Sequence, residues 1–296
     1  GYQCAENTLE EGLVAVLSYV ENGDDVSLRD VRGKIVLVNG FMRVPLFRKL
    51  MKAGVAGIVT MEGELRDKRE ETDLSTRKLR RTLRTFGNVP MVHTRVADAM
   101  DLVRKGACKA RLVLQGRTEE RTSHNVVATV LGTERPQEIL SFGAHYDSVA
   151  FSTGVYDNGA GSVINMEVLR YFAEHPPKRT LKFMWYGSEE IGLEGSWAYV
   201  KAHKEELSDH LLMINVDVAG PVLGADRIAA TAEEKLATYL DYFVKIHGFA
   251  AETKQGIYSS DSIPFADSGV PAVNFTRFGA QGAAYIHNRF DTLEFL

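Results

Sequence analysis

The chain has only two cysteines, Cys4 and Cys108, among its 296 residues. Two cysteines could form one bridge, but they are too few for a disulfide scaffold or a cysteine-rich metal site. No apolar run approaches the roughly 20 residues that a membrane-spanning helix requires, so we expect no membrane span. The first residues lack the basic-then-apolar pattern of an export signal. These absences leave the cellular compartment open.

The chain also lacks a strong excess of charge of either sign. Its 35 Lys and Arg residues against 39 Asp and Glu residues give a net charge of −4, and its pI is near 6.1. This balance argues against a nucleic-acid surface or an anionic membrane as a partner. With 45% hydrophobic residues, the chain can bury a sizeable core, and its length allows one large domain or two.

Short apolar runs alternate with helical patterns in the first 120 residues. Strands are predicted at residues 33–40, 55–61, 89–94 and 110–115, where apolar and β-branched residues are bounded by turn formers. Residues 46–54 have apolar side chains at helical spacing and end at Gly54, a suitable helix C-cap. A second helix is predicted at 96–106. The charge-dense segment 66–87 is expected to be a solvated loop or surface helix, since its interspersed acids disfavour a basic docking patch.

From about residue 124 the elements become longer. Strands are predicted at residues 125–132, 138–147, 180–187, 210–220 and 270–276. Helices are predicted at residues 161–175, 195–207 and 232–248. Strands that alternate with helices in this way indicate an α/β sheet covered by helices on both faces.

Acidic and histidine residues gather where the predicted strands of this second part end. They are His145 with Asp147, Asp157, Glu189 with Glu190, Asp217, and His287 with Asp291. Each has a structural alternative: Asp157, for example, could cap the helix that follows it. Chemistry in α/β sheets nevertheless concentrates at strand ends, and two histidines with three carboxylates are a ligand set that suits zinc. Together these residues predict a site for two metal ions.

The adjacent Glu189 and Glu190 directly follow a buried-looking strand, where carboxylates are costly unless paired or bound to a cation. Adjacent carboxylates that leave a strand can diverge, so that one binds metal while its neighbour transfers protons. Histidine ligands commonly donate their second ring N–H to a carboxylate. Asp147 is expected to accept that hydrogen bond from His145, and Asp291 is expected to do the same for His287.

Six segments occur in a fixed order from about residue 125 onward: GAHYDSV, DNGAGS, SEEIGLEGS, NVDVAG, SDSIPF with GVPAV, and HNRFDT. In this order they resemble the di-zinc aminopeptidase family typified by bacterial leucyl aminopeptidases and aminopeptidase Y. The resemblance implies a mixed central sheet flanked by helices, the zinc exopeptidase fold. It also implies hydrolysis of the N-terminal bond of peptides that have a free N-terminus.

The resemblance assigns the metal ligands. Asp157 would bridge two Zn²⁺ ions. Glu190 and His287 would complete one site, and His145 and Asp217 would complete the other.

The same resemblance implies the catalytic groups. Glu189 would be the general base that takes a proton from the metal-bridging water and passes it to the leaving amine, with Asp147 as a second catalytic residue. Tyr258 or Tyr285 could stabilise the oxyanion, and Asp261 is a further candidate on the substrate side. The family usually has histidine directly after this aspartate, where the present chain has serine.

Residues 1–120 resemble, more weakly, the protease-associated (PA) domain often inserted in this family, through the segments RGKIVLVNG and KAGVAGIVTM. Residues 121–296 would then form the peptidase domain. Family members have a helical segment before the inserted domain and a helix after the DTLE stretch, so the chain is expected to lack both flanks. The resemblance favours a secreted or periplasmic protein.

Three other functions stay open. A carboxypeptidase or a glutaminyl cyclase could use the same fold and zinc, and a carboxypeptidase would need an arginine such as Arg277 or Arg289 for the terminal carboxylate. A receptor-like ectodomain could keep the architecture without metals. The presence of all five ligands and the base argues against that last function.

Overall fold

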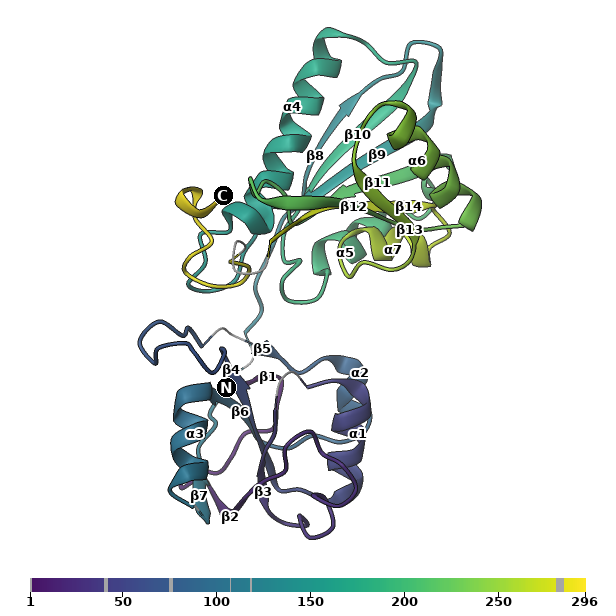
Figure 1. Cartoon of the computed structure of the whole chain (residues 1–296). Helices are drawn as coiled ribbons and strands as arrows, with labels where there is room; N and C mark the ends of the chain where they lie inside the picture. Colours follow the sequence, from purple (N-terminus) through teal and green to yellow (C-terminus); the bar gives the residue numbers. More distant parts are fainter. Residues whose placement is uncertain (1, 40–41, 75–76, 107, 118, 281–284) are drawn as a thin grey trace. The chain divides into compact units, whose positions relative to one another are not determined.

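The computed structural model describes residues 2–39, 42–74, 77–106, 108–117, 119–280 and 285–296. The chain forms two compact units, residues 1–120 and residues 121–296, and each has its own sheet and its own hydrophobic core (Figure 1).

A five-stranded sheet forms the centre of the first unit. Its strands are β2 (Leu13–Tyr19), β3 (Ile35–Leu37), β4 (Gly57–Glu62), β6 (Met91–Arg95) and β7 (Lys109–Leu112). They lie in the order β6-β4-β3-β2-β7, and every neighbouring pair is parallel except β2 and β7. A separate parallel pair joins β1 (Tyr2–Gln3) to β5 (Arg77–Lys78). The four strands predicted here are confirmed, and β2 was not predicted.

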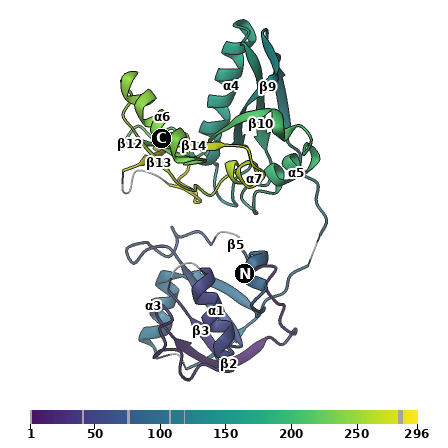
Figure 2. The ribbon, with the colours of Figure 1, turned by 90° about the vertical axis from the view of Figure 1, so that its right-hand side faces the viewer.

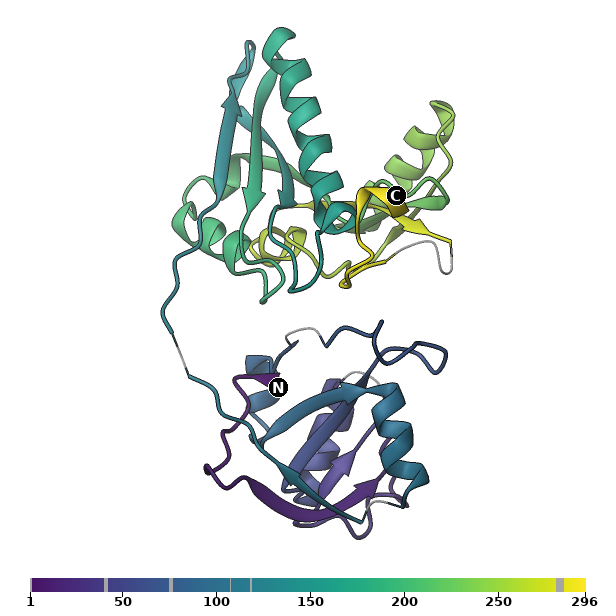
Figure 3. The same ribbon diagram turned by 90° about the vertical axis from the view of Figure 1, so that its left-hand side faces the viewer.

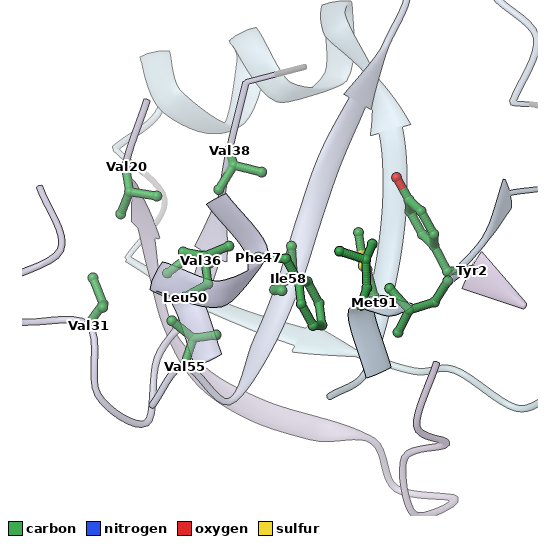
Figure 4. Close-up of a cluster of buried hydrophobic side chains, with 12 residues drawn as sticks. Tyr2, Val20, Val31, Val36, Val38, Phe47, Leu50, Val55, Ile58 and Met91 are labelled. Carbon is green, nitrogen blue, oxygen red and sulfur yellow. The ribbon is translucent and has the colours of Figure 1, made fainter. Parts of the chain in front are cut away.

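Helix α1 (Val44–Ala53) supplies much of the core of this unit. Its Phe47 and Leu50 are fully buried and pack with Val36, Ile58 and Met91 (Figure 4). Burying a side chain of this size stabilises the fold by about 1.5–3 kcal/mol. The helix ends at Gly54 as predicted: φ is 75° there, and the glycine N–H bonds the last carbonyls.

The described residues of the charged segment 66–87 are turns and irregular chain, apart from β5 and the short helix α2 (Arg81–Arg84). Arg77 forms a bidentate pair with Glu62, and Arg69 pairs with acidic residues of α3 (Val96–Arg104). These ion pairs fit the solvated surface that the sequence predicted.

A seven-stranded mixed sheet forms the centre of the second unit. Its strands are β8 (Val126–Val130), β9 (Arg135–His145), β10 (Arg179–Tyr186), β11 (His210–Val216), β12 (Gly224–Thr231), β13 (Ala251–Gln255) and β14 (Ala272–Gly279). The order is β13-β12-β14-β11-β9-β10-β8. The four central strands β14, β11, β9 and β10 are mutually parallel, so their carboxyl ends share one edge.

Helices cover both faces of this sheet. They are α4 (Ala160–Glu174), α5 (Glu194–Ala202), α6 (Glu234–Ile246) and α7 (Ser262–Asp267). Figures 2 and 3 show the helices on the two faces of the sheet. Alternate side chains of β10 divide between the faces: Phe183 and Trp185 pack on the α4 side, and Met184 and Tyr186 pack against α5 and α7. The predicted fold class, a mixed α/β sheet with helices on both faces, is confirmed.

Three short helical segments complete the second unit: η1 (Val155–Gly159), η2 (Leu207–Asp209) and η3 (Leu293–Phe295). Across the described ranges of the whole chain, no helix is long and apolar enough to cross a membrane. Cys4 and Cys108, both in the first unit, are exposed free thiols.

Candidate metal centre

The five predicted ligands come from loops at the shared carboxyl edge of the parallel strands. His145 is the last residue of β9, Asp217 follows β11, and Glu190 lies in the loop after β10. Asp157 belongs to η1, which leads into α4, and His287 lies beyond β14. Because parallel strands end at the same edge, residues far apart in sequence meet there.

Asp157 lies at the centre of the group. Its Oδ1 is 3.0 Å from Nε2 of His145, and its Oδ2 is 2.9 Å from Nε2 of His287. Nε2 of His145 is also 3.2 Å from Oδ1 of Asp217, and Nε2 of His287 is 3.2 Å from Oε2 of Glu190. The ligand atoms therefore form two sets of three, each within 4.8 Å, that share Asp157 alone.

The buried carboxylates among the five predicted ligands favour the binding of cations. Burial would raise the pKa of Asp157, but hydrogen bonds to His145 and His287 hold it well below its usual range. Burial would likewise lower the pKa of His287, yet its hydrogen bonds to Asp157 and Glu190 raise it to about 10. Buried carboxylates are thus stabilised by whatever positive charge is close, and a bound dication would supply more of it than a protonated imidazole does.

The residues fit zinc on two further grounds. Imidazole nitrogens and carboxylate oxygens are donors that zinc prefers, and ligands about 2.0–2.1 Å from a tetrahedral ion lie roughly 3.4 Å from one another. In addition, Oε1 of Glu190 is buried and, among the described residues, has no hydrogen-bond partner. An unsatisfied buried carboxylate oxygen is costly, and a cation would remove that cost.

Glu189 lies beside the ligands and belongs to neither ligand set. Burial raises the pKa of Glu189 to about 9; His145 opposes the shift and the negative charge of Asp261 adds to it. The two adjacent glutamates therefore have different surroundings, as their sequence position predicted. Glu190 contacts His287, whereas burial keeps the carboxyl group of Glu189 protonated at neutral pH when no cation is bound.

The Asp147 carboxylate lies within ion-pair distance of the ring of His145, but the ring N–H makes its hydrogen bond elsewhere. Nδ1 of His145 donates instead to the backbone carbonyl of Asp147 at 3.0 Å, while the carboxylate oxygen is 3.7 Å away. The carboxylate accepts the backbone N–H groups of Glu189 at 3.0 Å and Glu190 at 3.3 Å. A spacing of two residues brings both the carbonyl and the side chain near the ring, and the carbonyl has the better position.

Asp291 also has a role other than the one predicted. Its Oδ1 accepts the N–H of Tyr156 at 2.6 Å, and its Oδ2 accepts the N–H of Asp157 at 3.1 Å. The prediction that its carboxylate bonds His287 is therefore corrected: it orients the loop of the central ligand. Asp147 and Asp291 thus act alike, because each holds two successive backbone amides of a ligand loop.

The backbone of these loops is strained. Of the seven non-glycine residues with left-handed φ in the described structure, five lie in loops at this edge: Phe151, Ser188, Leu193, Val218 and His287, with φ between 60° and 71°. A left-handed conformation costs a side-chain-bearing residue roughly 1–2 kcal/mol. Such strain persists where surrounding contacts over-determine the backbone, as at ligand sites.

The predicted substrate-side residues lie in different surroundings. Tyr258 is half-buried, and burial together with the charges of Asp217 and Asp157 raises its pKa. The ring of Tyr285 packs 5.3 Å from that of Phe290. Asp261 is fully buried.

Asp261 accepts a short hydrogen bond from the hydroxyl of Ser196, and its other oxygen has no partner within the described part of the chain. Ser262, which stands where the family usually has histidine, is also buried, and the hydroxyl of Ser262 likewise has no partner there. The one sequence departure from the family pattern at this place, Ser262, is therefore a buried position.

Sequence reasoning missed two asparagines that shape the centre. Asn158 was considered only as a possible helix cap. It does accept the N–H of Gly161 at 3.1 Å, but it also donates to the carbonyl of Val216 at 2.8 Å and so ties the Asp157 loop to β11. Asn125, directly before β8, bonds the loop of Glu189 and Glu190. The glycines directly after Asn158 were a signal available for that residue, whereas the sequence around Asn125 contains none.

The centre thus consists of two candidate ligand sets that share one carboxylate, with a further carboxyl group beside them. Residues 125–296 match the model of peptidase family M28, and the chain belongs to this family.

Comparisons with individual proteins agree. The chain is similar to aminopeptidase YwaD of Bacillus subtilis, with 30% identity over 202 residues, which cover 63% of this chain and 42% of the relative. Human carboxypeptidase Q is 26% identical over 251 residues, 78% of this chain and 53% of that protein. The solved structure of BSAP, a zinc aminopeptidase from Bacillus subtilis, has a TM-score of 0.76 at 25% identity and covers 98% of this chain and 72% of that one. The chain thus spans about half of these curated relatives' length.

Proposed function

We propose that the protein is a zinc-dependent aminopeptidase that removes the N-terminal residue of peptides with a free N-terminus. The observation that carries the proposal is Asp157, whose two carboxylate oxygens face two histidines in separate ligand sets. A relative and a solved structure described as aminopeptidases support the same activity.

His145 and Asp217 would hold one zinc ion, and Glu190 and His287 would hold the other, with Asp157 between them. When bound, the ions would lower the pKa of a water molecule, polarise the scissile carbonyl and attract the free amine of the substrate.

Glu189 is the residue proposed to move the proton. Its carboxyl group is beside both ligand sets without belonging to either. Bound cations would lower its pKa, so that the carboxylate could accept a proton from the attacking water and deliver it to the nitrogen of the leaving amine. The Asp147 carboxylate keeps Glu189 in place by accepting a hydrogen bond from the backbone N–H of Glu189. Tyr258 is the better of the two tyrosine candidates for donating a hydrogen bond to the oxyanion, because the ligand carboxylates Asp217 and Asp157 influence its hydroxyl.

The charges at this edge of the sheet indicate which end of a peptide the centre would recognise. Carboxylates and metal ions recognise a free amine, whereas a carboxypeptidase needs a cation for the C-terminal carboxylate. The guanidinium of Arg277 is occupied by Asp226 and by the carbonyls of Pro221 and Val222. Arg289 is the remaining candidate, and the similarity to carboxypeptidase Q makes that activity the second function to test.

The test compares unblocked and N-acetylated aminoacyl anilides and short peptides, with apolar first residues as the first choice. An aminopeptidase cleaves the unblocked substrates alone. Equal rates on blocked and unblocked peptides would exclude the aminopeptidase, and release of the C-terminal residue would establish the carboxypeptidase instead.

We also propose that two zinc ions bind each chain. Elemental analysis of protein loaded with zinc and then desalted is expected to find close to two equivalents. One equivalent would favour a single-zinc cyclase, and none would favour the receptor-like function. Residues 1–120 are proposed to be a PA domain that assists substrate access or docking; the resemblance of their glycine-bounded strand segments supports this.

A further inference from the structure

The loop that bears Glu189 and Glu190 begins at Gly187, directly after β10, and leads into the first turn of α5, which contains Gly195. The side-chain amide of Asn125 bonds both ends. The N–H of Gly187 donates to Oδ1 of Asn125 at 3.3 Å, and Nδ2 of Asn125 donates to the carbonyl of Gly195 at 2.9 Å. One side chain thus closes residues 187–195 into a ring.

The two ends approach so closely because neither has a side chain. A Cβ atom at Gly195 would lie 2.5 Å from Oδ1 of Asn125 and closer still to the carbonyl oxygen of Gly187. A Cβ atom at Gly187 would lie 2.8 Å from the carbonyl oxygen of His124. Real Cβ atoms do not tolerate such contacts, so the glycines are required by this closure.

Asn125 is itself held against the metal-ligand strand. The hydroxyl of Tyr146 donates to the carbonyl of His124 at 2.6 Å. Tyr146 directly follows the ligand His145, and its own N–H donates to the carbonyl of Tyr186, at the end of β10. Asn125 also directly precedes β8, whose first residue Val126 pairs with Trp185 of β10. Its amide is therefore fixed relative to both β9 and β10.

We propose that Asn125 is a positioning residue for the catalytic base: by joining Gly187 to Gly195 it fixes the direction in which Glu189 and Glu190 leave the loop. This inference rests on the proposed function. The Asp147 carboxylate bonds the two glutamate amides in the middle of segment 187–195, and Asn125 bonds the two ends of that segment. With the ends joined, the carboxyl group of Glu190 stays directed into its ligand set, and the carboxyl group of Glu189 stays beside that set.

The alternative is that Asn125 merely satisfies backbone groups at a strand end. The chain offers a matched control for that role in the first unit. Asn88 accepts the N–H of Glu6 at 3.1 Å through Oδ1 and donates to the carbonyl of Cys4 at 3.1 Å through Nδ2. Its amide makes the same two-ended contact and lies on no ligand loop.

The experiment compares Asn125→Ala with Asn88→Ala in the zinc-loaded full chain. Misplacement of a catalytic group by about 1 Å can cost 10²-fold, so Asn125→Ala is expected to lower kcat by roughly 10–100-fold. KM should stay within about threefold and zinc content should be unchanged, because the ligands themselves remain. Asn88→Ala should leave kcat unchanged.

Amide hydrogen exchange of peptides that cover residues 187–195 gives a measurement that does not depend on activity. In both zinc-free and zinc-loaded protein, Asn125→Ala should speed this exchange about tenfold or more, and Asn88→Ala should not. If Asn125→Ala does not fold, Asn125→Asp replaces it. That variant keeps the acceptor for Gly187 and places a carboxylate oxygen against the carbonyl of Gly195.

Unchanged kcat and unchanged exchange in the Asn125 variant would overturn the proposal. An equal loss of kcat, zinc content and stability would also overturn it, because a purely structural role produces that result. Inactive wild-type protein with faster exchange in the variant would count against the proposed aminopeptidase and leave the loop closure supported.

Discussion

Oδ1 of Asp147 accepts the backbone N–H of Glu189 at 3.0 Å, and Oδ2 accepts that of Glu190 at 3.3 Å. A negatively charged acceptor thus sets the peptide plane between the proposed base and a metal ligand. Charge-assisted hydrogen bonds of this kind are about twice as strong as neutral ones.

Asp147→Asn should therefore impair the centre without unfolding the protein. One of the two oxygens becomes an NH₂ group that faces a backbone N–H, and that contact is repulsive. Substitution of such outer contacts typically costs 10–100-fold in metal affinity or activity, and we expect a loss in that range. Zinc titration and steady-state kinetics measure it. Asp24→Asn is the control, since Asp24 accepts two backbone amides in the first unit; a similar loss there would contradict the prediction.

Glu189→Gln and Glu190→Gln should have different effects although the residues are adjacent. Glu189→Gln is expected to keep its zinc and lose turnover by about 10²–10⁴-fold, because an amide cannot accept and return the proton. Glu190→Gln should weaken zinc binding, because Glu190 belongs to a ligand set. Metal content and kcat are measured for both variants. Exchanged effects would reverse the two assignments.

Ser188→Gly should raise stability and lower activity. Ser188 has φ 64°, a conformation that glycine adopts without strain. Glycine relieves the backbone strain, but it also gives the unfolded chain more conformational entropy, which opposes folding. The free energy of unfolding should therefore rise by about 1 kcal/mol or less. Thermal unfolding should show a rise of a few degrees, together with lower kcat as the loop loosens. Ser268→Gly, where φ is −99° at the end of α7, should give no rise; a rise in both variants would remove the strain argument.

Glu206 makes the second unit sensitive to acid. Partial burial would raise its pKa, but hydrogen bonds from Lys182 and His210 outweigh burial and lower the pKa from 4.5 to about 2. A group with a depressed folded-state pKa stabilises the fold above its unfolded pKa, and the stabilisation is lost as pH falls through the folded value. Stability measured by denaturant unfolding should therefore fall between about pH 4.5 and pH 2.

Glu206→Gln should flatten that acid dependence, whereas Glu205→Gln, at the exposed neighbouring position, should preserve it. If the stability of Glu206→Gln falls with pH as steeply as that of the wild type, other carboxyl groups cause the acid sensitivity.

The main elements of the sheet could be predicted because the central strands are nearly continuous apolar runs. Strands such as β10, buried on both faces, give that signal strongly. Strand β13 (AETKQ) was missed because it is polar and largely exposed at the sheet edge, and its neighbour β12 (GADRIAAT) because its first half is polar and exposed. Helix α7 was missed because six residues are too few to show helical periodicity. Edge strands and short helices depend on contacts that the local pattern does not contain.

The candidate site was predictable in its residue types and less so in its contacts. Histidines and acids at strand ends indicated a metal centre, and the resemblance assigned the five ligands. The partners of Asp147 and Asp291 were not predictable, because each carboxylate lies close enough in sequence to a histidine for either a ring or a backbone contact. The closure by Asn125 depends on two glycines that are 62 and 70 positions away.

The distribution of the ligands along the chain also sets an order of assembly. His145, Asp157 and Asp217 belong to β9, η1 and the end of β11, and β9 pairs directly with β11. That ligand set is complete once about the first half of the second unit has been synthesised and has folded. The other set needs His287, which follows β14, the strand that must first join β11. Because a domain generally folds as a unit, the proposed centre would be complete only after His287 has been synthesised and β14 has joined β11.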